Sequence, residues 1–242
     1  GNDYLTGGEG NDVLTGSNGS PLTNTEGNDL VIGDGGEDLL FGNRSNDKLF
    51  GGTEDDTLHG GRQDDWMVGE AGNDLAYGEL GNDTVVGGAG DDTLVGDNNG
   101  DNNAHGNDLI CAGDGNDIAF GSQGIDKVHG GAGNDTLFGG TDGDTLLGKT
   151  GNDVLLGDNG DDVLIGGEGN DVFVLAADTG VDTIEDFADG VDSVALAGGL
   201  QFSQLTVMET DTGAAISFGE QTLANLTGVQ ANELTQEDFQ GF

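Results

Sequence analysis

A nine-residue pattern of hydrophobic and polar positions runs through residues 1–177 of the chain. Each unit has the form G-[ND]-D-x-Φ-x-G-G-x, where Φ is apolar, and 18 such units can be aligned. The third position is Asp in all 18, and the fifth is apolar in all 18, from Leu5 to Phe173. The seventh is Gly in 16, with Ala112 and Leu175 as the exceptions. Biased composition alone does not hold two positions without exception, so we treat this as a true internal repeat.

One apolar residue per unit is too sparse for a helix or for a free strand. The x-Φ-x segment predicts a three-residue strand, with positive-φ turns at the glycines on either side. Such a unit cannot bury its apolar side chain alone, so neighbouring units must stack. Two units make an 18-residue coil with two short strands, and coils stacked about 4.8 Å apart build two parallel sheets face to face. We therefore expect an all-β fold, a parallel β-roll in the form of a right-handed solenoid.

The repeat also predicts how the chain is divided. The roll is expected over residues 1–177, interrupted by two insertions, 19–26 and 99–105, which we interpret as loops. After Val174 the period stops, and residues 178–242 are expected to form a β-rich cap. In this part, residues 184–194 predict strand, turn and strand, residues 202–207 and 214–218 predict further strands, and residues 223–240 leave room for a short helix.

Composition excludes several classes of protein. The 242 residues include 50 Gly, 47 Asp plus Glu and only five Lys plus Arg, for a net charge of −42. Nucleic-acid binding and binding to anionic lipid both need basic clusters, so neither partner is expected. No apolar run approaches the length that a membrane-spanning helix needs, so we expect no membrane insertion. Cys111 is the only cysteine, which excludes an internal disulfide. The N-terminus has neither an initiator Met nor a signal-peptide pattern, and we expect a fragment or a processed form.

The repeated Asp predicts a metal. Equivalent carboxylates one coil apart lie above one another and repel strongly unless they are compensated. Ca²⁺ accepts six to eight oxygen ligands, including the backbone carbonyls of Gly-rich turns. The first 171 residues hold 35 acids and five bases, a net charge of −30, and 18 turns paired one coil apart give at most about 16 sites, or +32. Solubility alone does not require Asp at one register of every unit, so we favour multiple calcium ions as the cofactor.

The unit Gly-Gly-Glu-Gly-Asn-Asp-Val-Leu-Thr, residues 7–15, resembles the nonapeptide of the repeats-in-toxin (RTX) family. The resemblance implies a parallel β-roll in a secreted bacterial protein, with calcium held between successive turns by Asp side chains and backbone carbonyls. It implies a metal-ligand role for these residues: Asp3, Asp12, Asp29, Asp38, Asp47, Asp56, Asp65, Asp74, Asp83, Asp92, Asp108, Asp117, Asp126, Asp135, Asp144, Asp153, Asp162 and Asp171.

Six substitutions in the repeat weaken this expectation locally. Four residues replace the first Gly, namely Ser45, Glu54, Gln63 and Asp142, and two replace the usual Asn or Asp at the second position, namely Ile125 and Gly143. The sites near residues 45–65 and 124–144 are therefore the least secure.

Residues 178–242 resemble the segment that ends RTX rolls in secreted proteins. The resemblance implies a C-terminal region read by the type I secretion apparatus, and hence a secreted protein that is extracellular or on the cell surface. A plain structural cap is the alternative, because a solenoid needs one in any case.

No constellation of residues indicates catalysis, so an enzyme is not expected. H-E-x-x-H, G-x-S-x-G, G-x-G-x-x-G and Walker patterns do not occur. His59 and His129 occupy the same repeat position and are expected at the surface. Cys111, at a strand position with no His near it in sequence, is expected to be an inert thiol.

Apolar residues at outward strand positions suggest a contact surface. Those in the later repeats are Ile118, Phe120, Phe138, Val154, Leu156, Val172 and Val174, and earlier repeats add Phe41, Phe50, Trp66 and Tyr77. Either the C-terminal segment folds back over them, or, as we prefer, they contact another protomer or an absent domain.

Two functions remain open. The first is a secreted structural or adhesive calcium-binding protein that associates with itself at the cell exterior, as a filament component or adhesin. The second is the calcium-folding and export module of a secreted enzyme, a protease or a lipase, whose catalytic domain is absent from this chain.

Overall fold

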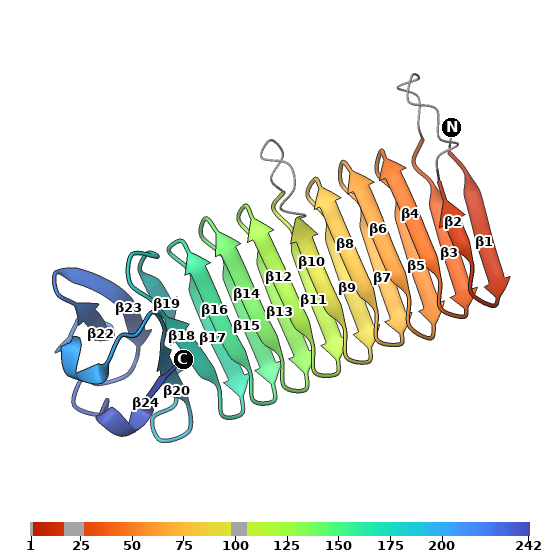
Figure 1. Cartoon of the computed structure of the whole chain (residues 1–242). Helices are drawn as coiled ribbons and strands as arrows, with labels where there is room; N and C mark the ends of the chain where they lie inside the picture. The colour runs from red at the N-terminus through yellow and green to blue at the C-terminus, as the bar shows by residue number, and fades with distance from the viewer. Residues whose placement is uncertain (1, 17–26, 98–105) are drawn as a thin grey trace.

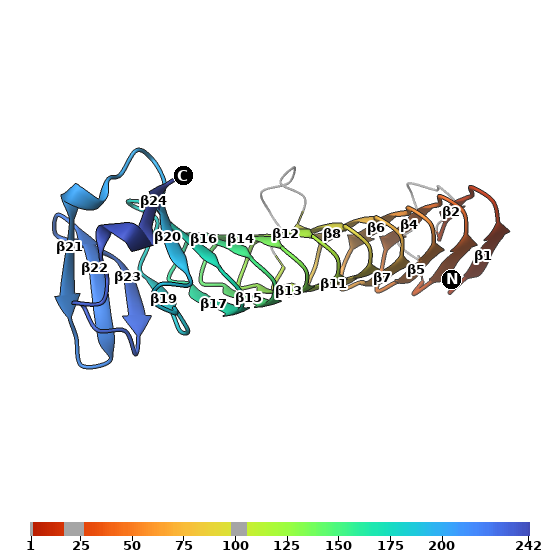
Figure 2. The same ribbon diagram turned by 90° about the horizontal axis from the view of Figure 1, so that it is seen from below.

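The computed structural model describes residues 2–16, 27–97 and 106–242. The two predicted insertion loops, 19–26 and 99–105, lie outside the described residues. The chain winds into a long, flat solenoid in which the odd- and even-numbered strands from β1 to β20 form two facing sheets (Figures 1 and 2). Strands from successive coils pair in parallel, which confirms the parallel β-roll.

The first sheet has 13 strands within the described residues. In spatial order these are β1 (Tyr4–Glu9), β3 (Leu30–Gly35), β5 (Lys48–Thr53), β7 (Trp66–Ala71), β9 (Thr84–Ala89), β11 (Leu109–Asp114), β13 (Lys127–Ala132), β15 (Thr145–Thr150), β17 (Val163–Glu168), β19 (Asp182–Ile184), β23 (Gln221–Thr227), β22 (Gly213–Phe218) and β21 (Leu205–Glu209).

The second sheet has 11 strands in the same part of the chain. They are β2 (Val13–Thr15), β4 (Leu39–Arg44), β6 (Thr57–Arg62), β8 (Leu75–Leu80), β10 (Thr93–Asp97), β12 (Ile118–Gln123), β14 (Thr136–Thr141), β16 (Val154–Asn159), β18 (Val172–Leu175), β20 (Ser193–Leu196) and β24 (Phe239–Gly241).

The strands of the roll are mostly six residues long, so the prediction of three-residue strands was wrong. The pairing of β3 with β5 joins Ile32 to Phe50, skips one position, and resumes between Asp34 and Gly52. Coils stack along their whole length, so hydrogen bonding continues past the seventh-position Gly and into the turn. The positive-φ turns are confirmed: Asp34, in the eighth position, has φ 73° and Gly52 has φ 125°.

The core is a single file of fifth-position side chains between the sheets. From Val31 to Phe173 each of these is 0% exposed, which confirms the predicted inward register. Their neighbours at the fourth and sixth positions point outward and remain at least partly exposed, except Val174, which is buried. Leu5 and Leu14, on the first coil, are less well covered because no described coil lies beyond them. Each coil thus buries only two side chains of this file, and in two coils one of the pair is Ala.

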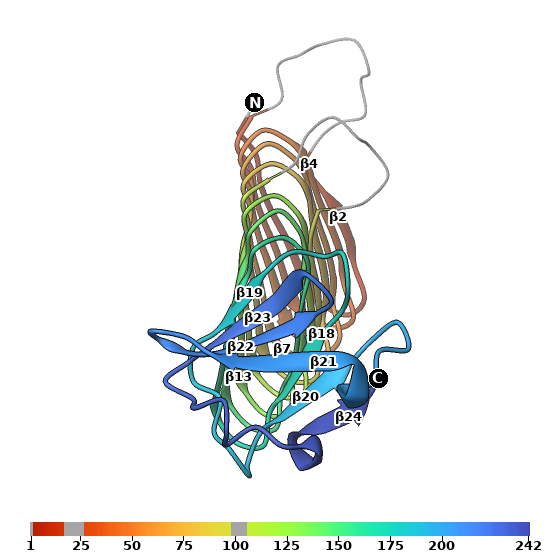
Figure 3. The same cartoon turned by 90° about the vertical axis from the view of Figure 1, so that its left-hand side faces the viewer.

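The C-terminal segment continues the roll and then closes it. β19 and β20 pair in parallel with β17 and β18, and β23 and β24 extend the sheets further. β21, β22 and β23 form an antiparallel meander that lies across the end of the solenoid (Figure 3). Two short 3-10 helices, η1 (Phe202–Gln204) and η2 (Gln236–Asp238), complete it. No helix in the described residues is long and apolar enough to span a membrane.

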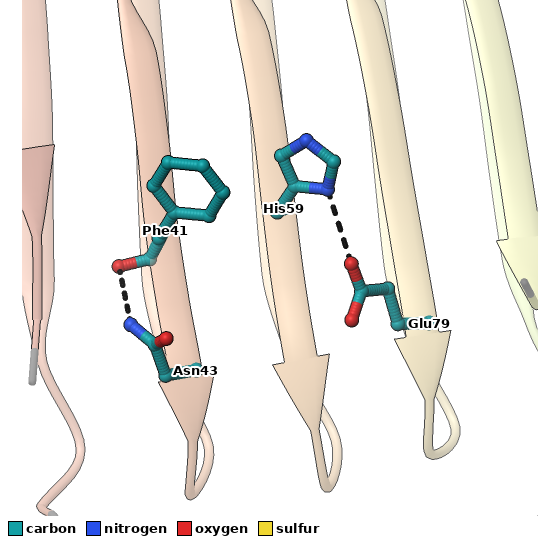
Figure 4. Close-up of polar contacts among 4 residues, drawn as sticks. All are labelled: Phe41, Asn43, His59 and Glu79. Atoms are coloured by element: carbon teal, nitrogen blue, oxygen red, sulfur yellow. Dashed lines mark hydrogen bonds and ion pairs between the residues drawn. The ribbon is translucent and has the colours of Figure 1, made fainter. Parts of the chain in front are cut away.

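Sixth-position side chains form a continuous row on the outer face of the second sheet. This outer row comprises Phe41, His59, Tyr77, Val95, Phe120, Phe138, Leu156 and Val174. His59 is stacked between Phe41 and Tyr77, with ring centroids 4.9 and 5.1 Å apart. Its Nδ1 lies 3.0 Å from Oε1 of Glu79, in hydrogen-bonding contact (Figure 4). The side-chain amide of Asn43 donates to the Phe41 carbonyl in the same view.

Candidate metal centre

Each repeat Asp occupies a turn immediately before a strand, so the 18 carboxylates form two lines along opposite edges of the roll. The line that precedes strands of the first sheet holds Asp3, Asp29, Asp47, Asp65, Asp83, Asp108, Asp126, Asp144 and Asp162. The other line holds Asp12, Asp38, Asp56, Asp74, Asp92, Asp117, Asp135, Asp153 and Asp171. The structure therefore stacks all the predicted site residues, but in two lines rather than in one cluster.

One carboxylate oxygen of each Asp fixes the stacking. Oδ1 of Asp47 accepts the backbone N–H of Asp29, one coil earlier, at 2.8 Å. The same bond recurs from Asp3 and Asp29, at 2.7 Å, to Asp153 and Asp171, at 2.9 Å. The Asp carbonyl in turn accepts the first N–H of the strand in the next coil. Each Asp is thus tied by hydrogen bonds to the coil before it and to the coil after it.

The other carboxylate oxygen has no hydrogen-bond donor, although it is buried. This holds for Oδ2 of Asp12, Asp38, Asp56, Asp65, Asp74, Asp83, Asp92, Asp108, Asp117, Asp126, Asp135, Asp144, Asp153, Asp162 and Asp171. A buried carboxylate oxygen without a donor is costly, because it has lost its water and gained nothing in exchange. Its regular recurrence indicates a position built for a cation.

Backbone carbonyl oxygens converge on the same positions. A Cβ placed on Gly60 would lie 2.6 Å from Asp65 Oδ2 and 2.9 Å from the carbonyl oxygen of Gly78, one coil further on. The same arrangement surrounds Gly7, with Asp12 Oδ2 at 2.7 Å and the Gly33 carbonyl at 2.8 Å. A carboxylate from one coil and a carbonyl from the next therefore face a common space. Gly is favoured at the seventh position because a side chain there would fill part of that space, and Ala112 is the one small exception before a repeat Asp.

Burial and mutual repulsion make several of these carboxyl groups poor acids. Sixteen of the 18 are at most 3% exposed; Asp3 is exposed and Asp12 is partly exposed. Burial, followed by the charges of neighbouring Asp residues in the same line, raises the pKa of Asp65 to about 8 and that of Asp108 to about 9. Burial and the carboxylates of Asp126 and Asp162 raise the pKa of Asp144 to about 8. Such groups ionise at neutral pH only if a cation stabilises the charge.

The donor set fits Ca²⁺ and does not fit a transition metal. All the converging atoms are carboxylate or carbonyl oxygens, which hard cations prefer. No group of three or more His, Cys, Asp and Glu side chains converges anywhere in the described ranges. A site in this roll must therefore combine a few Asp oxygens with backbone carbonyls of two adjacent turns.

The irregular repeats keep the Asp lines intact. Ser45, Glu54, Gln63 and Asp142 stand where most repeats have Gly, and they adopt the left-handed conformation with φ between 72° and 82°. The Asp ladder runs without interruption past them, for instance from Asp126 to Asp144 at 2.8 Å. These substitutions strain the backbone locally without displacing the carboxylates.

A second ladder involves the second-position residues. Asn134 accepts the backbone N–H of Asn152 at 2.7 Å, the reverse direction to the Asp ladder. Ile125 donates its N–H to Asn107 but offers no side-chain acceptor to the following coil. Gly143 likewise has no side chain to offer. The sites near residues 124–144 were predicted to be among the weakest, and the missing side-chain acceptors at Ile125 and Gly143 give a physical reason for that prediction.

Two residues that extend the lines were missed by the sequence analysis. Asp182 Oδ1 accepts the N–H of Asp162 at 3.4 Å, and Asp192 Oδ1 accepts that of Asp171 at 3.0 Å. Both are buried, and burial together with Asp162 raises the pKa of Asp182 to about 8. The available signal was the G-V-D-x-Φ pattern at residues 180–184 and 190–194. It was obscured because the separation of hydrogen-bonded Asp residues grows from 18 positions to 20 and then 21.

The second oxygen of Asp192 is hydrogen bonded, unlike that of most repeat Asp residues. Asp192 Oδ2 accepts the N–H of Ala188 at 2.7 Å, so its carboxylate is fully used by hydrogen bonds. Nearby, Asp186 replaces the seventh-position Gly and accepts the N–H groups of Gly166 and Gly167, at 2.9 and 2.8 Å. Hydrogen bonds thus take over from the open carboxylate oxygens where the roll ends.

Cys111 has a histidine neighbour that the sequence did not indicate. Cys111 and His129 are paired across β11 and β13, with Sγ 3.8 Å from Nδ1. Burial raises the pKa of the Cys111 thiol, while burial and two lysines lower the pKa of His129. The pair is therefore a neutral thiol beside a neutral imidazole, not the thiolate–imidazolium pair of a nucleophile.

Comparisons with known proteins identify the family of the repeat. No curated protein matches the chain. Among solved structures, the extracellular lipase LipA from Serratia marcescens matches with 16% sequence identity and a TM-score of 0.31. The match covers 88% of this chain and 45% of the lipase, so this chain spans less than half of that protein. The model of the RTX calcium-binding nonapeptide repeat matches residues 1–20, 23–58, 41–76, 59–94, 68–102, 112–146 and 138–173. Since these matches span nearly the whole roll, the chain belongs to the RTX calcium-binding nonapeptide repeat family.

Proposed function

We propose that this chain is a secreted structural or adhesive module that folds when it binds extracellular calcium. The observation that carries the proposal is the regular row of buried Asp Oδ2 atoms without a donor, most of which share a space with a backbone carbonyl of an adjacent coil. We assign the 18 repeat Asp residues as the calcium ligands, with the seventh-position carbonyls completing each site. Ca²⁺ supplies the positive charge that lets these carboxylates stay ionised inside the roll.

Calcium is expected to decide whether the chain folds at all. The core is one side chain deep, so the apolar surface buried per coil is small and cannot offset both chain entropy and stacked carboxylates. Binding energy then becomes folding energy, as in other small metal-dependent folds. The resulting affinities belong in the submillimolar to millimolar range of extracellular modules.

This dependence suits export. A chain that stays unfolded at the low free calcium of a cytosol can thread through a type I secretion channel and fold outside. In this proposal residues 1–177 are the calcium-binding unit and residues 178–242 are the cap and the region that the apparatus reads. Residues 178–242 contain 12 acids and no Lys or Arg, so this region is anionic throughout.

The outer row supports a role in association. Phe120 and Phe138 are stacked with centroids 4.6 Å apart and remain partly exposed, and Ile118 beside them is 41% exposed. The cap lies at the end of the roll, and of these later outward residues only Val174 is buried (Figure 3). We propose that a second copy of the chain packs on this face once calcium has neutralised both rolls.

The test is the circular dichroism spectrum with and without a calcium chelator. We expect a disordered spectrum in chelator and a β-rich spectrum in millimolar calcium, with magnesium a poor substitute because it demands a small octahedral site. A β-rich spectrum that chelator leaves unchanged would contradict calcium-driven folding.

A further inference from the structure

Two surface hollows that lie outside the proposed calcium-binding turns are lined by the same kinds of residue at the same repeat positions. The first, of about 320 Å³, lies on the outer face of the second sheet between β12, β14 and β16. Phe120 and Phe138 form its apolar wall, Gly140 its floor and Asp158 its far end. The second, of about 310 Å³, lies on the first sheet between β3, β5 and β7.

The pairing register explains the first hollow. Ser122, Gly140 and Asp158 are cross-strand partners in the eighth-position row, beside the Phe120–Phe138 stack in the outer row. The two phenyl rings are nearly parallel, with an interplanar angle of 11°, so they stand side by side as a wall. Gly140 lines the hollow beside that wall, and a Cβ on Gly140 would meet the backbone of Ser122. The carboxylate of Asp158, one strand further, closes the hollow.

The second hollow repeats this order of residues. Ile32 and Phe50 form the wall, and Gly52 lies between Asp34 and Glu70 in the eighth-position row, so this hollow has a carboxylate on each side of its glycine. An apolar wall, a glycine floor and a carboxylate thus occur twice, on opposite faces, at the same repeat positions. Neither hollow contains a repeat Asp.

We propose that each hollow binds an alkylammonium group, with its hydrocarbon chain against the wall and its nitrogen at the carboxylate. The apolar wall takes up hydrocarbon, and a carboxylate beside it selects a cationic end. Asp158 is exposed, but neighbouring atoms displace enough water to raise its pKa, which strengthens its interaction with a bound cation. The −42 charge of the chain attracts cations and repels anions. Hollows of this size suit a group as large as a lysine side chain.

The two hollows are poorly suited to bind calcium. The first hollow has one carboxylate, that of Asp158, and the second has two, those of Asp34 and Glu70, and both are lined on one side by apolar side chains. A hard cation needs six or more oxygens. The hollows are therefore expected to take an organic cation while calcium fills the turns, so this inference does not depend on how the calcium ions are bound.

The experiment titrates the calcium-loaded full chain with n-butylammonium, followed by saturation-transfer NMR at a concentration where light scattering shows monomers. We expect binding in the millimolar range. The double variant Phe50→Ala with Phe138→Ala should weaken it about tenfold. The double variant Glu70→Gln with Asp158→Asn should weaken it about fivefold.

Controls separate a site from general attraction to negative charge. Glu220→Gln removes an exposed carboxylate from the turn between β22 and β23 and should leave the affinity unchanged. Circular dichroism in calcium checks that every variant keeps the β-roll. If Glu220→Gln weakens binding as much as the change at Glu70 and Asp158, or if the Phe variants bind like wild type, the proposal is wrong.

A second arm identifies the source of the ammonium group. A blocked tripeptide with one central lysine is titrated in the same way. If it binds with the same dependence on Phe138 and Asp158, the ligand is a lysine side chain of a partner protein. If only the free amine binds, the ligand is a small amine, and if neither binds the proposal fails.

Discussion

Replacing Asp135 tests whether each carboxylate serves two neighbouring turns. Asp135 Oδ1 accepts the N–H of Asp117, one coil before, at 3.0 Å. A Cβ placed on Gly130 would contact both Asp135 Oδ2 and, at 2.9 Å, the carbonyl oxygen of Gly148, one coil after. Because its two oxygens face opposite neighbours, Asp135→Ala should impair both the site before it and the site after it.

The structure gives the size of the effect. The change leaves the buried N–H of Asp117 without an acceptor, which costs about 1–3 kcal/mol of folding stability. It also removes one oxygen from each of two sites, so calorimetric titration should find about two fewer calcium ions per chain. Asp135→Asn is the matched control, since its amide oxygen can still accept from Asp117 while the charge is lost. It should lower the calcium count similarly but keep more of the stability.

Asp3 provides the end-of-line comparison. Its N–H donates to Asp29 Oδ1 at 2.7 Å, but its own carboxylate is exposed and has a described coil on one side only. Asp3→Ala should therefore remove about one ion and cost little stability. Equal losses of calcium from Asp3→Ala and Asp135→Ala would refute the reasoning that sites lie between stacked turns.

Three further predictions concern the charge of the Asp lines, the backbone strain at Asp142 and the self-association of the chain. In chelator, any residual β-structure should be most stable below about pH 4 and should be lost as the pH rises through about 4 to 9. The reason is that the pKa of Asp65 is about 8 and that of Asp108 about 9 in the folded chain, whereas free Asp titrates near 4. Circular dichroism against pH checks this, and greater stability at pH 9 than at pH 5 would contradict it. Asp142→Gly should stabilise the calcium-loaded roll by about 1 kcal/mol, because it relieves the strain of a non-glycine residue at a φ of 75° and removes a charge near Asp126 and Asp144. Thermal unfolding measures this, and an unchanged or lower midpoint temperature would count against it. Self-association should require calcium and should disappear in Phe120→Ser with Phe138→Ser while the fold persists; light scattering that finds the wild-type chain monomeric in concentrated, calcium-loaded solution would end that proposal.

Much of the architecture follows from the sequence because the repeat is nearly exact. The invariant fifth position identified every core residue from Val31 to Phe173, and period two within a strand placed its neighbours outside. The constant length of most coils meant that equivalent Asp residues must stack, whatever the details of the turn. These conclusions need only local chain geometry and the requirement that apolar side chains be buried.

Other features depend on pairing between coils, which no local pattern specifies. Strands run to six residues because stacked backbones keep bonding beyond the seventh-position Gly. Asp182 and Asp192 join the lines despite spacings of 20 and 21 residues, because the extra residues are absorbed outside the paired segments. Cys111 meets His129 for the same reason, across a strand pair formed 18 residues apart.

The two oxygens of each Asp show most clearly where the sequence stops and the tertiary structure begins. Composition and register required a cation near every repeat Asp, because stacked carboxylates cannot remain charged alone. Only the packed coils assign Oδ1 to a backbone N–H of one neighbour and leave Oδ2 facing a glycine carbonyl of the other. That division arises because the coil spacing fixes which backbone groups each carboxylate can reach, and the spacing exists only once the coils have stacked.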